Sequence, residues 1–261
     1  LFKRSKVFLI IDSGLFEKLI FLILGSENVS IIIHGEAGFG SYIENWKKIL
    51  YYRLFKFFIY KTKCKIIFLS HYLNENFHSN SNFYFLEHPG FYEKYGKIKI
   101  SDKINSVGAI SIEKNNNNYL KDIDIIAVRN NLTVNHYGNF FITLKSYKNI
   151  NFNGFIDIKL NLKIFSQSKF IFLLNNSEYR NIVSGVVIQS IYNLCLIITY
   201  DKYPKIIDYY ENLFDTNIHI SFQDFINLKE PNIYYNSKIK NLTLLRNKLT
   251  NQSLFDSNKI F

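Results

Sequence analysis

The chain has 261 residues, of which 48% are hydrophobic and 17% aromatic. This length and composition exclude an intrinsically disordered protein and allow one large hydrophobic core or two smaller ones. The net charge of +11 suits nucleic acid, an anionic membrane or a phosphorylated substrate, but the lysines are scattered and accompany no nucleic-acid motif, so nucleic acid is not expected.

Short strand-like runs alternate with helical ones along the first 90 residues, which is the pattern of a parallel sheet with crossover helices. The predicted strands cover residues 6–11, 29–34, 65–70 and 82–86, and the predicted helices cover 15–24, 42–60 and 72–77. The apolar run 7–24 is interrupted by Asp12, Glu17 and Lys18. It therefore predicts neither a transmembrane helix nor a signal peptide.

Residues 87–96 break the alternation with Pro89, Gly90 and Gly96, so they predict a linker. A second series follows, with predicted strands at 103–110, 124–129, 170–174, 196–200 and 218–221 and a polar helical pattern at 236–252. The resulting domains are residues 1–90, residues 97–235, and a C-terminal helix and tail at 236–261.

The two cysteines, Cys64 and Cys195, fall in or beside predicted strands of different halves. We expect reduced, buried thiols in a reducing compartment, not a disulfide or a metal site. The chain contains no Met, even at position 1, and we expect further residues upstream of Leu1.

The most informative stretch lies between the apolar strands predicted at 170–174 and 195–199. It reads Glu178-Tyr179-Arg180, three more residues, and then Ser184-Gly185 at the start of a predicted helix. A helix N-terminus offers free backbone N–H groups and the positive end of the helix dipole, and a Ser-Gly pair lets the chain approach a diphosphate closely.

This order of strand, Glu-Tyr-Arg turn, Ser-Gly, helix and strand resembles the C-terminal half of GT-B-fold glycosyltransferases. The chain is similar to the bacterial group 1 enzymes of polysaccharide and lipopolysaccharide biosynthesis. The resemblance implies an α/β fold with two Rossmann-like domains facing a cleft, the first of them incomplete at its N-terminus. It also implies a nucleotide-sugar donor, a glycan or lipid-linked glycan acceptor, and a metal-independent transferase of the hexosyl type that needs no cofactor.

The resemblance extends to the donor site. The segment 106–110 looks like the first strand and loop of the nucleotide-binding domain, where Gly108 would permit close approach and Lys114 would neutralise the diphosphate. The remaining residues of the expected nucleotide-sugar site are Glu178, Arg180, Ser184, Gly185 and Gln189. A bulky residue in place of Ser184 is expected to abolish nucleotide binding.

Gln189 departs from the family, because many retaining enzymes carry a carboxylate there that bonds the ribose hydroxyls. Either nucleotide affinity is weaker, or Glu178 takes that role. Arg180 would stabilise the leaving nucleotide, and the other interpretation makes it a surface partner of Glu178.

On the acceptor side, the segment 31–36 is a strand that ends in His34-Gly35-Glu36, which resembles the acceptor loop of polysaccharide glycosyltransferases. His34 or Glu36 is the expected catalytic base, and the alternative is that His34 only caps the following helix. Ser70 is expected to cap a helix. Asp122-Ile123-Asp124 has the spacing of a metal-binding motif but is interpreted as the start of a core strand.

The segment 47–63 mixes aromatic and aliphatic residues with six lysines and arginines. Two interpretations remain open. The first is a crossover helix packed on the sheet with outward-snorkelling lysines. The second is peripheral membrane contact, with the protein in the cytoplasm or at the inner face of the cytoplasmic membrane. Two other functions remain: a non-catalytic or decayed GT-B-like protein that binds nucleotide sugar, and a nucleotide-sugar epimerase.

Overall fold

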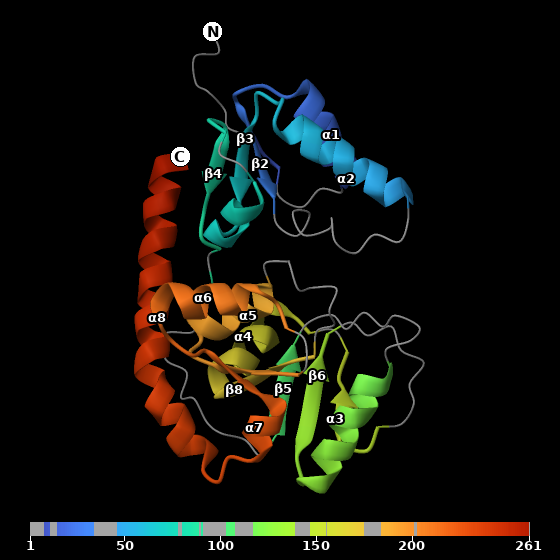
Figure 1. The fold of residues 1–261 in the computed structure, drawn as a ribbon, viewed down its shortest axis with the longest axis vertical. Coiled ribbons are helices and arrows are strands. Elements are labelled where there is room, and N and C mark those ends of the chain that lie inside the picture. The colour runs from blue at the N-terminus through green and yellow to red at the C-terminus, as the bar shows by residue number, and fades with distance from the viewer. Residues whose placement is uncertain are drawn as a thin grey trace. The chain divides into compact units, whose positions relative to one another are not determined.

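The structure is a computed structural model. It describes residues 8–10, 15–33, 46–77, 80–88, 90, 103–107, 117–138, 147–154, 156–174, 184–200 and 203–260. The chain divides into two compact units, and each is built on a parallel sheet (Figure 1). The first unit takes in the chain up to His88 and its end from Leu249, and the second takes most of the residues between them.

The first unit contains a four-stranded parallel sheet in the order β1-β2-β3-β4. Its strands are β1 (Phe8–Ile10), β2 (Val29–Ile33), β3 (Lys65–Phe68) and β4 (Phe83–Phe85). The connections hold α1 (Leu15–Leu24), α2 (Trp46–Ile59) and the 3₁₀ helix η2 (His71–Asn76). All seven elements were predicted from the sequence. The strands are runs of Ile and Phe because neighbouring elements bury both faces of a parallel sheet.

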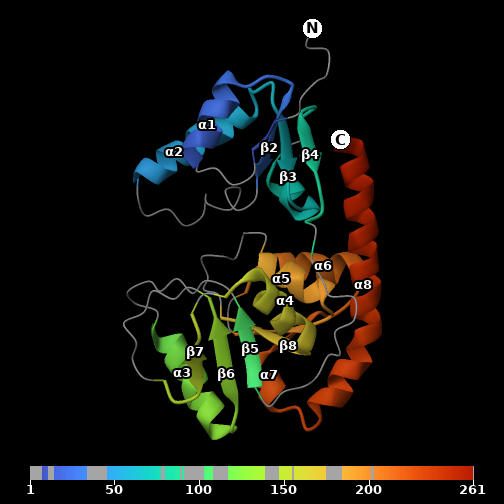
Figure 2. The same ribbon diagram turned by 180° about the vertical axis from the view of Figure 1, so that it is seen from behind.

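The second unit contains a six-stranded parallel sheet in the order β10-β9-β8-β5-β6-β7. Its strands are β5 (Lys103–Val107), β6 (Thr133–Tyr137), β7 (Ile150–Phe152), β8 (Phe170–Leu173), β9 (Leu196–Thr199) and β10 (His219–Ser221). Figure 2 shows β7 beside β6 at one edge. The helices are α3 (Asn117–Arg129), α4 (Ile158–Gln167), α5 (Gly185–Tyr192), α6 (Ile206–Phe214) and α7 (Phe222–Ile226). The α/β class with parallel sheets is confirmed.

The strand predicted at 124–129 is wrong, because these residues form the second half of helix α3. Leu120, Ile123 and Ala127 are fully buried and recur every three to four residues, which is the spacing of one face of a helix. Within 124–129, Ala127 belongs to this buried face, whereas Ile125 and Val128 are exposed.

The strands β6 and β7 were not predicted because polar residues occupy them. Ser106 of β5 and His136 of β6 form a buried hydrogen bond of 3.1 Å between Oγ and Nδ1. The Asn151 amide of β7 donates to the Asn135 side-chain oxygen at 3.1 Å. These hydrogen bonds between side chains of neighbouring strands let polar residues be buried in the sheet, so such a strand does not require an apolar sequence.

The last helix, α8 (Pro231–Ile260), is anchored on the second unit near its start. The Tyr235 hydroxyl donates to the Leu194 carbonyl at 2.8 Å, and the Lys169 ammonium lies 5.2 Å from the centre of the Tyr235 ring. Burial, together with the nearby Cys195, raises the pKa of the Tyr235 phenol. The residues of α8 up to Lys248 belong to the second unit, and those from Leu249 belong to the first.

Both cysteines are free and buried, as predicted. Burial raises the pKa of both thiols, and the Cys195 thiol donates to the Ser168 carbonyl at 3.1 Å. Among the described residues, no helix is both long enough and apolar enough to cross a bilayer.

Asp124 of α3 holds the chain that leads into β7. One of its carboxylate oxygens accepts the Asn149 N–H at 2.7 Å, and the other accepts the Lys148 N–H at 3.1 Å. Replacing Asp124 with Ala removes two charge-assisted bonds and should lower the free energy of unfolding by about 1–2 kcal/mol, measured by urea denaturation. The control Asp122→Ala, on the exposed side of the same helix, should change stability by less than about 0.5 kcal/mol. Equal losses in both variants would contradict this role.

Candidate functional site

The order of strands in the second unit reverses at β5. The chain builds β5, β6 and β7 outward in one direction and then returns to place β8 on the other side of β5. Asn105 of β5 is paired with Ile171 of β8. Open α/β sheets bind ligands beyond the carboxyl ends of the strands at such a reversal. The ends of β5 and β8, at Val107 and Leu173, therefore mark the candidate site.

The predicted donor-site residues follow these two strands in sequence. Gly108 comes directly after β5 and Lys114 a few residues later, while Glu178 and Arg180 lie between β8 and α5. All four lie outside the described residues, so their roles stay predictions. Ser184 and Gly185 are described, and they form the start of α5 as predicted.

The N-terminus of α5 is open. Ser184 is the N-cap residue with extended backbone (φ −78°, ψ 115°), its carbonyl accepts the Ile188 N–H at 3.2 Å, and its side chain makes no capping bond. Gly185 is exposed, and among the described residues nothing would lie within 4 Å of a Cβ added there. Among the described residues, no side chain caps the first N–H groups of the helix, so these groups and the positive end of the dipole are available to an anion.

The rest of α5 is fixed by packing. Val187, Ile188 and Ile191 are almost completely buried, and Val186 packs against a cluster that includes Val107 at the end of β5 and Ile171 within β8. The strands β5 and β8, whose ends mark the candidate site, therefore also position α5 through packing.

Gln189 lies one turn after Gly185, on the same face of α5, and is half-buried. Its carbonyl accepts both the N–H and the side-chain amide of Asn193, at 3.1 and 2.9 Å. This position near the open end of the helix is compatible with the predicted contact to a nucleotide.

In the first unit, His34 and Glu36 lie outside the described residues, directly after β2. Described polar residues that follow β3 and β4 include Ser70, His71, Glu87 and His88. Ser70 caps η2 as predicted, because its Oγ accepts the Tyr72 N–H at 3.1 Å.

Glu87 is a candidate that the sequence interpretation missed. This carboxylate is 2% exposed, follows β4, and accepts the His71 N–H at 3.2 Å. The sequence interpretation assigned it to the linker, although a charged residue two positions after an apolar strand was the available signal. It is a buried acid at the edge of the sheet where ligands bind in parallel α/β folds.

The Asp122-Ile123-Asp124 spacing does not form a metal site in the described chain. Both carboxylates stand on α3, where Asp122 is exposed and Asp124 bonds backbone N–H groups. Within the described ranges, no three His, Cys, Asp or Glu side chains gather as metal ligands. The assignment of this segment to the start of a core strand is wrong, because both residues lie on α3.

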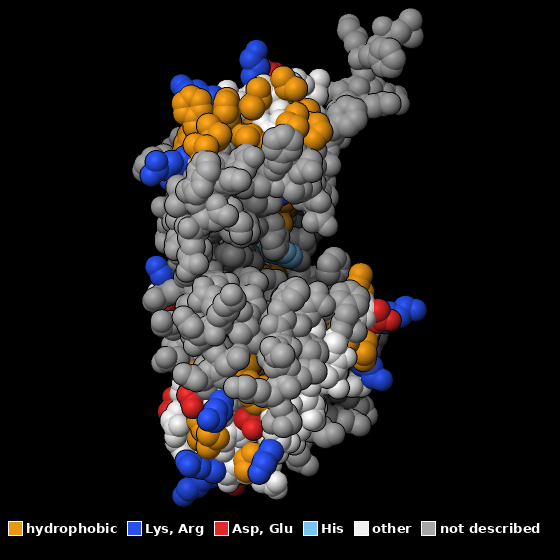
Figure 3. Space-filling view, turned by 90° about the vertical axis from the view of Figure 1, so that its right-hand side faces the viewer, with side chains coloured by type: hydrophobic (Ala, Val, Ile, Leu, Met, Phe, Trp, Pro, Cys, Tyr) orange, Lys and Arg blue, Asp and Glu red, His pale blue; other side chains and the backbone are white. Residues whose placement is uncertain are grey.

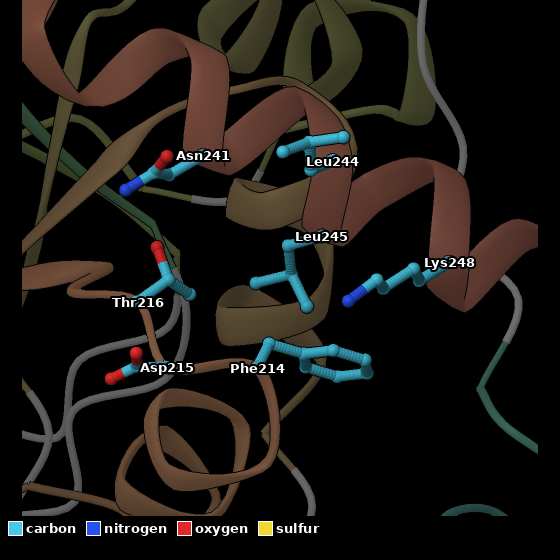
Figure 4. Close-up of a pocket in the computed structure, with 7 residues that line it drawn as sticks. All are labelled: Phe214, Asp215, Thr216, Asn241, Leu244, Leu245 and Lys248. Carbon is cyan, nitrogen blue, oxygen red and sulfur yellow. The ribbon is translucent and has the colours of Figure 1, made fainter.

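A cavity of about 240 Å³ lies between the end of α6 and α8 (Figure 4). Leu245 and Phe214 line it, and the Lys248 ammonium lies 5.0 Å from the centre of the Phe214 ring. Thr216, another lining residue, precedes β10 and so lies toward the amino ends of the strands. The cavity is therefore not part of the carboxyl-edge site.

Comparison with known proteins identifies the fold. No family model and no curated protein sequence matches the chain. Among solved structures, HepE from Anabaena, in complex with UDP and glucose, matches with a TM-score of 0.63 and 10% identity over 97% of this chain and 76% of its own. TarM matches with a TM-score of 0.53 and 12% identity over 96% of this chain, which spans about half (51%) of the TarM chain. The spinosyn forosaminyltransferase SpnP matches with a TM-score of 0.52 and 8% identity over 94% of this chain and 72% of its own.

These structures are GT-B glycosyltransferases, and the chain has their fold. The parallel sheets and the order of strands at the reversal agree with this assignment. The GT-B resemblance inferred from the Ser184-Gly185 segment is therefore confirmed for the fold.

The packing of Gly90 against α5 provides a test of how the helix is positioned. A Cβ on Gly90 would collide with the Tyr192 ring, whereas a Cβ on Gly185 would meet nothing described. Gly90→Ala should lower the free energy of unfolding by about 1–3 kcal/mol because the Tyr192 ring must move. The control Gly185→Ala should be neutral or slightly stabilising, since Ala favours the helix. Chemical denaturation measures both, and a neutral Gly90→Ala would exclude tight packing at Tyr192.

Proposed function

We propose that this chain is a glycosyltransferase that moves a sugar from a nucleotide-sugar donor to a glycan or lipid-linked glycan acceptor in cell-surface polysaccharide synthesis. The observation that carries the proposal is the open N-terminus of α5 beside the reversal point of the six-stranded sheet. The GT-B fold supports it, as do the solved complexes of HepE with UDP and glucose and of a TarM variant with UDP and GlcNAc-glycerol.

The chemistry follows from charge. An acceptor hydroxyl attacks the anomeric carbon and forms the new glycosidic bond, while the sugar–phosphate C–O bond breaks and its electron pair leaves with the nucleoside diphosphate. In the proposed site, the N–H groups of α5, with Arg180 and Lys114, stabilise the charge that develops on this leaving group. His34 or Glu36 accepts the proton of the attacking hydroxyl.

The donor is to be identified by thermal-shift titration with UDP-, GDP-, dTDP- and CMP-sugars, since a ligand that binds only the native state raises its stability.

Gly185→Asp then tests whether the diphosphate of this donor binds at α5. Its carboxylate should stabilise α5 through the helix dipole by about 0.3–1 kcal/mol, yet repel the diphosphate. We expect unchanged or higher stability without ligand and affinity lowered by at least about tenfold, or about 1.4 kcal/mol.

The control is Gly185→Ala, which adds a methyl group in open space and no charge. It should lower donor affinity less than Gly185→Asp does, because it places no negative charge beside the diphosphate. Full affinity in Gly185→Asp, or equal losses in both variants, would overturn the assignment of the diphosphate to α5. Donor binding without turnover would favour a non-catalytic protein, and an isomerised nucleotide sugar without transfer would favour an epimerase.

We propose that the reaction needs no metal ion, because helix N–H groups and basic side chains take over the charge of the diphosphate. Treatment with EDTA should leave donor affinity and the rate of nucleoside diphosphate release within about twofold of the untreated values. A large loss that Mg²⁺ restores would contradict metal independence and leave the fold assignment unaffected.

A further inference from the structure

The helices α1 and α2 expose an apolar surface on the first unit. They pack side by side in both ribbon views, and each turns large hydrophobic residues outward. The exposed residues are Ile20, Phe21, Ile23 and Leu24 on α1, and Leu50, Leu54 and Phe57 on α2. We call this set the α1–α2 face. Figure 3 shows hydrophobic side chains gathered there, with lysines and arginines at their upper and left margins.

The pattern on α2 shows that the exposure follows from the sequence of the helix. Leu50, Leu54 and Phe57 recur at intervals of four and three and form one stripe. Phe55 and Ile59, on the opposite side, are almost completely buried. The helix is therefore apolar on both sides, whereas a surface helix normally buries its apolar side and exposes a polar one.

The same division holds on α1. Leu19 and Leu22 are buried, while Leu24 is 77% exposed. An exposed apolar patch drawn from two neighbouring helices, unlike a lone exposed leucine, indicates a surface that another body covers.

The charges beside the α1–α2 face indicate which kind of partner covers it. Residues 46–63 contain six lysines and arginines and no Asp or Glu. Within this segment, Arg53, Lys56, Lys61 and Lys63 are exposed in the structure. On the α2 side, the apolar face is bordered by positive charge, and the exposed Glu27 follows the end of α1. The basic border is complementary to an anionic bilayer, whose acyl region takes the apolar side chains and whose headgroups take the lysines.

A second copy of the chain is a poorer fit. A two-fold dimer would bring the same patch of both copies together and set one basic border against the other. Repulsion between these borders would oppose the gain from apolar burial.

We propose that the α1–α2 face docks on an anionic lipid bilayer. The surface is wider than the segment 47–63 predicted from the sequence, because α1 supplies more than half of its apolar residues. The proposal does not depend on what α5 binds, although a membrane-bound enzyme would suit a lipid-linked acceptor.

The test is flotation of the full chain with phosphatidylcholine vesicles that contain no or about 30% phosphatidylglycerol. We expect binding to the anionic vesicles that is at least about tenfold tighter than to the neutral ones and that weakens with added salt. Absence of binding to both, or equal binding to both at all salt concentrations, would overturn the proposal.

Matched variants locate the surface. Leu24→Ser with Phe57→Ser removes side chains that are 77% and 57% exposed, and the control pair Ile158→Ser with Leu213→Ser removes side chains that are 79% and 54% exposed in the second unit. The first pair should lower vesicle affinity about tenfold or more, and the control pair should not.

Both pairs should keep the thermal stability and donor binding of the wild type, so failure here is distinguishable from failure of the nucleotide site. Equal losses in the two pairs would overturn the assignment of the face. The assignment would also be overturned if sedimentation detected a dimer that does not bind vesicles and that Leu24→Ser with Phe57→Ser dissociates.

Discussion

The structure depends on the common direction of its strands. All strands of a parallel sheet end on one edge, so each connection after a strand begins there, and each helix that follows can point its N-terminus toward that edge. In the second unit the order reverses between β5 and β8, and α5 begins after β8. The position of Ser184-Gly185 therefore results from strand order, and Val186 fixes it by packing on Val107 and Ile171.

The sequence predicted those elements that are buried through apolar side chains. Helix α1 begins and ends where expected, and β8 and β9 differ from their predicted ranges only at an end. It did not predict β6 and β7, since Asn135, His136 and Asn151 are polar and form side-chain hydrogen bonds with other strands. Such a hydrogen bond cannot be inferred from one strand alone. The strand assigned to 124–129 was instead a helix, because isoleucines that are close in sequence fit either period.

The candidate site likewise contains features that could be predicted from the sequence and features that could not. Its helix start was predictable, because Ser-Gly between two apolar runs is a local signal with a local cause. The buried Glu87 was not predicted, because its position depends on β4 pairing with β3 and on a bond to His71, sixteen residues away. Asp124 is the opposite case, in which a sequence signal was present but did not mark a site. Its spacing from Asp122 is typical of metal ligands, yet its carboxylate accepts hydrogen bonds from the backbone before β7.

The helices α2 and α8 show why positive charge alone did not reveal function. Both are rich in lysine, but α8 buries Leu242, Leu245 and Leu249 along one stripe, while Lys240 is exposed and Lys248 lies over the Phe214 ring. Helix α2 also packs on its unit, as a crossover helix with snorkelling lysines would, yet it exposes a second apolar stripe through Leu54 and Phe57. The difference lies in the apolar residues beside the charges. Lysines around a hydrated surface need no partner, whereas lysines around exposed phenylalanine and leucine match the two layers of a membrane surface.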